Sequence, residues 1–194
     1  MKKLLSILAA FGLSASAATS VVACDSGDSA SEKLVKDFYK NLKAPANEDE
    51  AGHAYDDLMD ARSKAVKEIK EDVFDTEEPE GNVTQEELDA IENHEKAQLV
   101  FAYNVTMEYY DIYDYIWDGD KQDALDLLPE FKKLKDYKMD VQDTGLKSNF
   151  APSKANKEGI DKLSKDLEEK INAIKVDTEE PEEPGTETEE TVTK

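Results

Sequence analysis

The sequence has few of the residues that build disulfide-bonded, metal-binding or catalytic sites. Its 194 residues include one cysteine, two histidines and one tryptophan, and Arg62 is the sole arginine. One cysteine forms no disulfide within the chain. The sequence also has no P-loop, no Rossmann glycine pattern and no G-x-S-x-G nucleophile motif. We therefore expect a protein that is not an enzyme, with no catalytic residue, no metal site and no bound cofactor.

Glycine, proline and positive charge are also scarce. There are eight glycines and six prolines, and 24 basic residues stand against 46 acidic ones, giving a net charge of -22. Runs of β-branched residues are almost absent, so the chain favours helices over strands. The negative charge argues against nucleic acid and anionic lipid surfaces as partners, because both would repel the protein. Cationic groups are the natural counterparts.

The first 24 residues have the pattern of a lipoprotein signal peptide. Two lysines precede an apolar stretch, residues 4–13, which is well short of the roughly 20 residues of a membrane-spanning helix. Residues 21–24, Val-Val-Ala-Cys, then fit a lipobox. We predict cleavage between Ala23 and Cys24 and attachment of a diacylglyceryl lipid to the Cys24 thiol. An ordinary secretory signal with an incidental cysteine is the alternative.

Residues 1–24 resemble the leaders of mollicute surface lipoproteins of the spiralin type, and the resemblance is confined to them. It implies a lipid-bearing Cys24, acylated with chains such as palmitate, on the extracellular face of the plasma membrane, which is the cell surface in a cell without a wall. Two acyl chains, at about 0.8 kcal/mol per buried CH₂, anchor a protein effectively permanently. Removal of the leader, which carries two lysines and no acid, changes the net charge from -22 to -24. The resemblance implies where the protein is located and how it is anchored, but it implies no activity.

Behind the leader the sequence divides into a lipidated tether (24–30), a helical domain (31–176) and an acidic tail (177–194) that we expect to be disordered. Apolar residues recur at helical spacing through the domain, and proline or glycine separates the periodic segments. This pattern predicts an all-α fold, a bundle of four to five helices. The expected helices span residues 31–42, 48–74, 84–117, 121–138 and 154–176. A capping box of Thr84 and Glu87 marks the start of the third helix.

The third predicted helix carries an unusually wide apolar and aromatic surface. One hypothesis leaves part of it exposed as a contact surface for a protein partner, because aromatic residues are favoured anchors at interfaces. The other makes this the central helix, with the same residues in the core and the tyrosine hydroxyls reaching its rim. The candidate contact residues are Tyr103, Tyr110, Tyr113 and Trp117.

One ion pair is predicted inside the bundle. Arg62 interrupts the apolar stripe of the second predicted helix, and Glu95 interrupts that of the third. If residues 75–83 form the turn of an antiparallel hairpin, the two lie at similar distances from the turn and face each other. We predict a partly buried Arg62–Glu95 ion pair that fixes the register of the two helices.

The two histidines offer little for metal binding. Glu50 and His53 have the E-x-x-H spacing of di-iron bundles, but that chemistry needs two such motifs, and the sequence has one. The predicted function is binding at the cell surface by a membrane-anchored lipoprotein, with its partner and oligomeric state left open. A ligand-binding accessory of a transporter and a structural coat element are the alternatives.

Overall fold

The computed structural model describes residues 28–74, 83–140 and 149–175, and most of these are helical. The elements, in chain order, are α2 (Ala30–Asn41), α3 (Glu48–Phe74), α4 (Gln85–Asn93), α5 (Ala97–Asp118), α6 (Lys121–Lys133), the 3-10 helix η1 (Leu134–Asp136), β1 (Met139–Asp140), β2 (Asn149–Phe150) and α7 (Lys154–Ala173). The predicted all-α bundle is confirmed. The predicted signal peptide, lipidated Cys24 and acidic tail lie outside the described residues.

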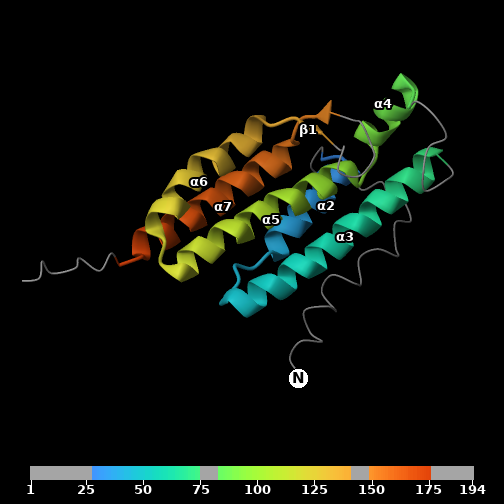
Figure 1. Ribbon diagram of the computed structural model, residues 1–194. Helices are drawn as coiled ribbons and strands as arrows, with labels where there is room; N and C mark the ends of the chain where they lie inside the picture. The colour runs from blue at the N-terminus through green and yellow to red at the C-terminus, as the bar shows by residue number, and fades with distance from the viewer. Residues whose placement is uncertain (1–27, 75–82, 141–148, 176–194) are drawn as a thin grey trace, which may run out of the picture.

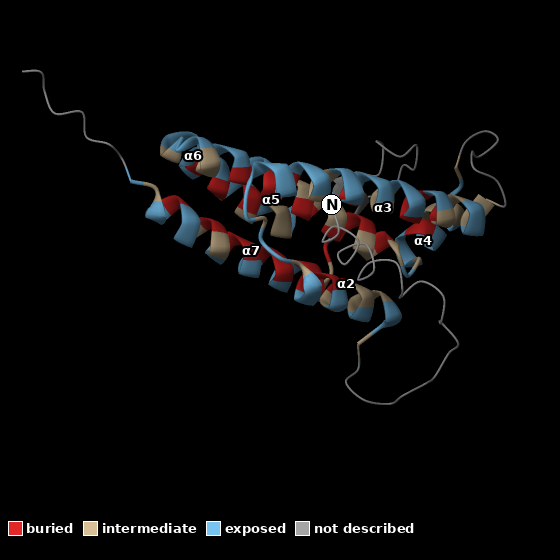
Figure 2. Ribbon diagram, turned by 90° about the horizontal axis from the view of Figure 1, so that it is seen from below, coloured by how far each residue is buried: buried red, intermediate tan, exposed pale blue. Residues whose placement is uncertain are grey.

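The central helix of the bundle is α5. It packs against α2, α3, α6 and α7, while α2 and α6 each also pack against α7. Figure 1 shows α5 running through the middle of the molecule, with α3 on one side and α6 on the other. Seen from below, α6, α5 and α3 form one layer and α7 and α2 form the other, with buried faces turned inward (Figure 2). Within the described segments, no helix has the length and apolar character needed to cross a bilayer.

Helix ends follow the local chemistry of the sequence. The predicted capping box is present: the Glu87 N–H donates to the Thr84 hydroxyl at 3.3 Å, and the Thr84 N–H donates to the Glu87 carboxylate at 2.6 Å. Helix α5 ends where Gly119 adopts a left-handed φ of 78°, a conformation that glycine reaches without a Cβ clash. Between η1 and α7, β1 and β2 form a two-residue antiparallel ladder in which Met139 lies opposite Phe150.

The predicted third helix is interrupted, so α4 and α5 are separate helices and the prediction of one helix over 84–117 is wrong. His94 lies in the turn between them. Its Nδ1 accepts a hydrogen bond from the Lys96 backbone N–H at 3.1 Å, and its Nε2 lies 3.0 Å from the Asp72 carboxylate on α3. Lys96 forms an ion pair with Glu68, also on α3. These contacts satisfy polar groups that a continuous helix would bond internally, and they hold the turn against α3.

The interruption also explains why the predicted Arg62–Glu95 ion pair is wrong. Arg62 Nε donates to the Asn104 side-chain oxygen at 2.6 Å, whereas Glu95 is exposed in the turn between α4 and α5. The prediction assumed one straight helix after the hairpin loop. Because α4 is a separate short helix, Arg62 faces a residue nine positions further along the chain than expected.

The aromatic stripe of α5 belongs to the core. Tyr110 and Tyr113 are 5% and 2% exposed, and Tyr103 and Trp117 are partly buried against the same cluster. Tyr103 packs edge-on against Phe38 of α2, and Tyr113 packs against Trp117, each with ring centroids 5.2 Å apart. The central-helix hypothesis is therefore confirmed, and the hypothesis of an exposed contact surface on these residues is wrong, since α5 is covered from several sides.

Candidate functional site

Polar side chains gather at three places in the described part of the bundle. They line a trough along α7, they join the N-termini of α2 and α7, and they surround a pocket between α3 and α5. In the first two places several of these groups bond to other parts of the bundle, whereas the charges of the third have no counterpart among the described residues.

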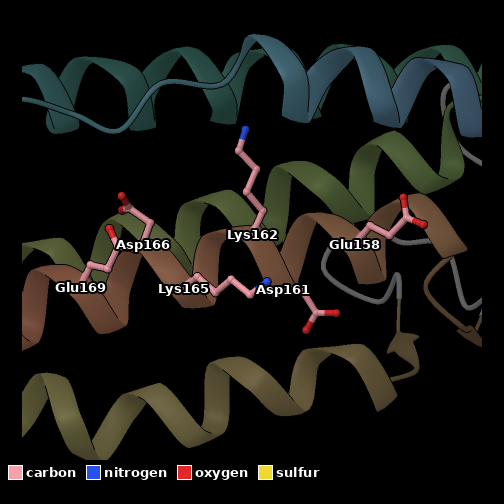
Figure 3. Close-up of a pocket in the computed structure, with 6 residues that line it drawn as sticks. All are labelled: Glu158, Asp161, Lys162, Lys165, Asp166 and Glu169. Atoms are coloured by element: carbon pink, nitrogen blue, oxygen red, sulfur yellow. The ribbon is translucent and has the colours of Figure 1, made fainter.

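The trough along α7, about 500 Å³ in volume, is lined by that helix alone (Figure 3). Its charged groups contribute to helix packing. Lys162 donates to the Tyr39 carbonyl of α2 at 2.7 Å, and Asp161 accepts from Lys135 at 2.6 Å. Asp166 accepts hydrogen bonds from two tyrosines of α5. The trough therefore has a structural role. Its lining residues are Glu158, Asp161, Lys162, Lys165, Asp166 and Glu169.

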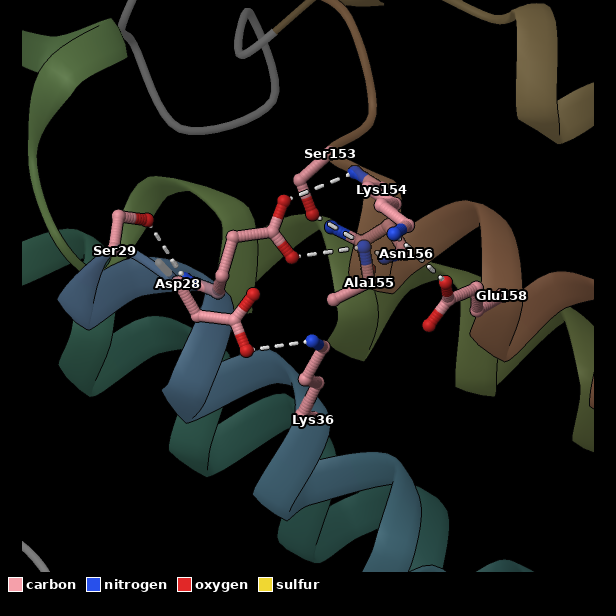
Figure 4. A network of polar contacts seen from close by, with 9 residues as sticks. Asp28, Ser29, Lys36, Ser153, Lys154, Ala155, Asn156 and Glu158 are labelled. Carbon is pink, nitrogen blue, oxygen red and sulfur yellow. Dashed lines mark hydrogen bonds and ion pairs between the residues drawn. The ribbon is translucent and has the colours of Figure 1, made fainter. Parts of the chain in front are cut away.

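The second network fixes α2 against the start of α7 (Figure 4). Ser153 caps α7 by accepting the Asn156 N–H at 3.2 Å. The Glu32 carboxylate of α2 accepts the N–H groups of Lys154 and Ala155 at 3.1 and 2.9 Å. A carboxylate is stabilising there because it meets free N–H groups at the positive end of the helix dipole. These groups are bonded to one another, so this network is also structural.

The third place is an open pocket of about 540 Å³ where the start of α3 meets the C-terminal half of α5. Helix α3 begins here because Asn47 caps it, accepting the Glu50 N–H at 2.9 Å. Acidic residues favour the first turn of a helix, and the α3 sequence begins Glu-Asp-Glu. The lining residues are Glu48, Asp49, Ala51, Gly52, His53, Tyr55 and Asp56 from α3 and Tyr110, Asp111 and Asp114 from α5.

The pocket concentrates negative charge without a balancing cation. Five of its ten lining residues are acidic, and in the described segments none of the five forms an ion pair with lysine, arginine or histidine. Burial, together with Glu108 and Asp114, raises the pKa of Asp111. Burial and the nearby Asp118 raise the pKa of Asp114. The carboxylates thus repel one another, and a cation placed among them would relieve that repulsion.

Two tyrosines complete the wall of the pocket. Tyr110 is 95% buried, since only 5% of its surface is exposed, yet its hydroxyl forms no hydrogen bond within the described part of the chain. Burial raises the pKa of Tyr110 to about 12, so the hydroxyl stays neutral at physiological pH. Tyr55 is half-buried, and burial together with Asp111 and Glu108 raises its pKa. The Ser31 hydroxyl is the one buried side-chain polar atom without a partner among the described residues, so the Tyr110 hydroxyl is in contact with solvent at the pocket.

The geometry does not favour a compact metal site. The Glu50 carboxylate accepts the Ala46 N–H at 3.2 Å and so helps to cap α3, and it does not line the pocket with His53. Among the residues that the structure describes, no three histidine, cysteine, aspartate or glutamate side chains lie close enough together to hold a metal ion.

Of the residues predicted for a site, only one lines this pocket. This residue is Tyr110. The other three aromatic residues, Tyr103, Tyr113 and Trp117, pack in the core, and Arg62 bonds Asn104. The predicted cleavage and lipidation residues, Ala23 and Cys24, lie outside the described residues. The pocket itself was missed, although the sequence held a signal for it. No lysine or arginine occurs in α5 or in the first 14 residues of α3, whereas the acids of α7 are interspersed with lysines. Two helices rich in unbalanced acids would predict a cation-binding surface if their contact were known.

No family model, curated protein or solved structure matches this chain.

Proposed function

We propose that the protein is a lipid-anchored binding module of the cell surface, and that it binds cationic ligands in the acidic pocket between α3 and α5. The observation that carries this proposal is the set of five carboxylates that line one pocket without a paired cation among the described residues. The anchor is the predicted lipid on Cys24, which the leader pattern and its resemblance to mollicute lipoproteins support.

The position of the pocket suits a molecule held at a membrane by its N-terminus. Helix α2 begins beside the start of α7, and Gln98 near the start of α5 bonds Ser153 and Asn156 there. Tyr110 lies twelve residues further along α5, or about 18 Å at 1.5 Å per residue. A lipid on Cys24, five residues before Ser29, would hold the bundle by this end. The pocket would then lie toward the end of the bundle that is further from the bilayer, where extracellular ligands arrive.

The binding part of the proposal is tested on the full-length chain, expressed with its leader and extracted in detergent. Thermal unfolding is followed at constant ionic strength with amines, a lysine-rich peptide or Ca²⁺ added. A ligand that binds only the folded state raises the midpoint in a saturable way. We expect at least one organic cation to do so, and the Asp111→Asn/Asp114→Asn variant to lose the effect.

A charge-matched control distinguishes binding in the pocket from an effect of the protein's overall negative charge. Asp123 and Asp126 are exposed on α6, so their replacement by asparagine changes the net charge by the same amount at another place. This variant should respond as the wild type does. An equal loss in both variants, or no response to any cation, would overturn the proposed binding function.

The anchor is tested separately in cells. Radiolabelled palmitate should label the wild-type chain, and a Cys24→Ser variant should carry no label and retain Met1. An unlabelled wild-type chain would remove the anchor from the proposal and leave the pocket to be judged on its own.

A structural coat element and a transporter accessory are the other candidate functions. A saturable response to a cationic small molecule would favour the second over the first, because a coat element needs no ligand.

A further inference from the structure

We propose that His94 is a pH-sensitive lock on the turn between α4 and α5. The neutral imidazole holds the turn closed against α3, and a second proton on the ring releases it. This inference is independent of the acidic pocket and of the lipid anchor. It follows from the hydrogen bonds of the two ring nitrogens, the burial of the ring and the way in which α4 is attached to the bundle.

The His94 ring forms a bridge between the turn and α3. Its Nδ1 accepts the Lys96 backbone N–H at 3.1 Å, and its Nε2 lies 3.0 Å from the Asp72 carboxylate. A backbone N–H can only donate, so Nδ1 must present its lone pair and Nε2 must carry the proton of the neutral ring. The Nε2–H group therefore donates to Asp72. The neutral ring makes both contacts at once, and it does so in this tautomer alone.

A second proton removes one of these contacts. Imidazolium is a donor at both nitrogens, so a proton on Nδ1 would point at the Lys96 N–H, which is also a donor. The ring can then keep its contact with Asp72, but it cannot hold the turn. The His94 side chain is 12% exposed, so water has little access to replace the lost acceptor. Because Nδ1 is free to take a proton only when the turn is open, acid favours the open turn.

The charges around the ring do not remove this conflict. Asp72 attracts an imidazolium, but its side chain is 70% exposed, and exposed ion pairs contribute little. Asp72 also accepts from the neutral ring already, so protonation strengthens a contact that exists in either state. The charged groups around the ring are Lys64, Glu68 and Asp72 from α3, Glu92 from α4, and Glu95 and Lys96 from the turn, where Lys96 is paired with Glu68.

The element that this lock controls is α4. The helix has nine residues, of which Ile91 is the buried one, and it packs chiefly against α3. Figure 1 shows α4 at one end of the bundle. The His94 bridge ties the C-terminal end of α4 to α3. When the bridge is broken, fewer contacts hold α4, so it should open more often and expose Ile91 to solvent.

Amide hydrogen exchange, measured by mass spectrometry, tests this inference on the full-length protein in detergent. Protection is compared at about pH 7.5 and about pH 5, where ordinary carboxyl groups stay mostly ionised, after correction for the intrinsic pH dependence of exchange. Residues 85–97 should lose protection by at least about fivefold at the lower pH, as the loss of one hydrogen bond predicts. The core of α7, residues 160–171, should stay within about twofold.

Two histidine variants show whether His94 is the group that responds. In His94→Asn the side-chain oxygen can accept the N–H two residues further on, as in an Asx turn, and asparagine does not titrate. This variant should keep the turn closed at both pH values. His53 is the other histidine and is exposed on α3, so His53→Asn should keep the full pH response. Circular dichroism shows whether each variant is folded.

Asp72→Asn separates protonation of the ring from protonation of its partner. Asparagine keeps an acceptor for the Nε2–H group without a charge that titrates, and the pH response should persist because the conflict arises at Nδ1. A response that survives in His94→Asn, or one that disappears in Asp72→Asn, would overturn the inference. So would an equal loss of protection in α7, which would indicate general acid unfolding, or no response in the wild type.

Discussion

The Tyr109 hydroxyl donates a hydrogen bond to the Asp166 carboxylate at 2.6 Å and so joins the central helix α5 to α7. Tyr113, one turn further along α5, donates to the same oxygen at 2.5 Å. Both tyrosines are almost fully buried, and Asp166 lies half-buried at the edge of the core. A carboxylate is a strong acceptor, so one acid accepts from two buried hydroxyls whose other contact is with each other, at 3.3 Å.

The first prediction concerns this contact. Asp166→Ala should lower the free energy of unfolding by about 2 kcal/mol, because two buried hydroxyls lose their charged acceptor and keep only the contact with each other. Glu169→Ala changes an exposed acid one turn away on the same helix and should stay within about 0.5 kcal/mol of the wild type. Urea unfolding of the three proteins measures the difference. Similar small effects in both variants would show that the two hydrogen bonds add little.

The second prediction concerns alkaline pH. Burial raises the pKa of Tyr39 above its ordinary value of 10.0. Burial, aided by Asp166, does the same for the pKa of Tyr109 and of Tyr113, and burial raises the pKa of Tyr110 to about 12. Above pH 10 the unfolded chain therefore binds fewer protons than the folded one. Stability must then fall as pH rises past 10.

Absorbance of tyrosinate and far-UV circular dichroism, recorded together against pH, check this. The chain has eight tyrosines, and these four should ionise only as the helical signal is lost. Ionisation of all eight near pH 10 with the helices intact would contradict the assigned burial.

Local features of the fold were predictable from the sequence, because spacing and caps act over a few residues. The predicted second helix has the observed bounds, Glu48–Phe74, and the Thr84 capping box forms as expected. The break at His94 was not predictable in this way. It depends on Asp72, 22 residues earlier in the chain, and on the pairing of Lys96 with α3. Helical periodicity continues through this segment, and only tertiary contacts override it.

The candidate pocket could not be predicted from the sequence for a similar reason. Its two halves, residues 48–56 and 110–114, are separated by more than fifty residues and meet only because α3 and α5 pack together. Each half shows unbalanced acids, but acids without lysines are also usual on a solvated helix face. Tyr110 was noticed for its aromatic ring, whereas its place in the wall of the pocket is visible only in three dimensions.

The third prediction concerns Gly159 of α7, on which the Tyr39 ring rests. A Cβ at this position would lie 2.3 Å from a ring carbon of Tyr39. Gly159→Ala should therefore force Tyr39 to shift and destabilise the protein by about 1–3 kcal/mol. Gly52 is the matched control, since it is also helical but a Cβ there would meet no atom within 4 Å. Gly52→Ala should stabilise by about 0.5–1 kcal/mol, because alanine is the better helix former.

Urea unfolding should thus show that the same glycine-to-alanine change lowers the free energy of unfolding in α7 and raises it in α3. Stabilisation by Gly159→Ala would mean that the ring of Tyr39 does not rest on this glycine. The Gly52 result also bears on the pocket, which this residue lines: a stabilised Gly52→Ala protein would show that the helix wall tolerates a methyl group.

The last prediction concerns the cost of the acidic pocket to the protein itself. Burial raises the pKa of Asp111 and of Asp114 above the ordinary 3.8. A carboxyl whose pKa is higher in the folded than in the unfolded state loses folding free energy as pH rises from 3.8 through its folded pKa. The full cost is then present at neutral pH. Asp111→Asn/Asp114→Asn should be more stable than the wild type at pH 7 by about 0.5 kcal/mol.

The pH dependence distinguishes this local repulsion from a general effect of net charge. The charged and titratable groups around the pair are Glu108 and Asp118 on α5 and Glu48, Asp49, His53, Tyr55 and Asp56 on α3. The gain should shrink as pH is lowered toward 3.8, because the wild-type carboxyls then become neutral as well. Asp123→Asn/Asp126→Asn removes the same charge from α6, and an equal gain in that variant would assign the effect to net charge. A protein that is more stable without its pocket acids carries them at a cost in folding free energy, which is what the proposed binding function expects.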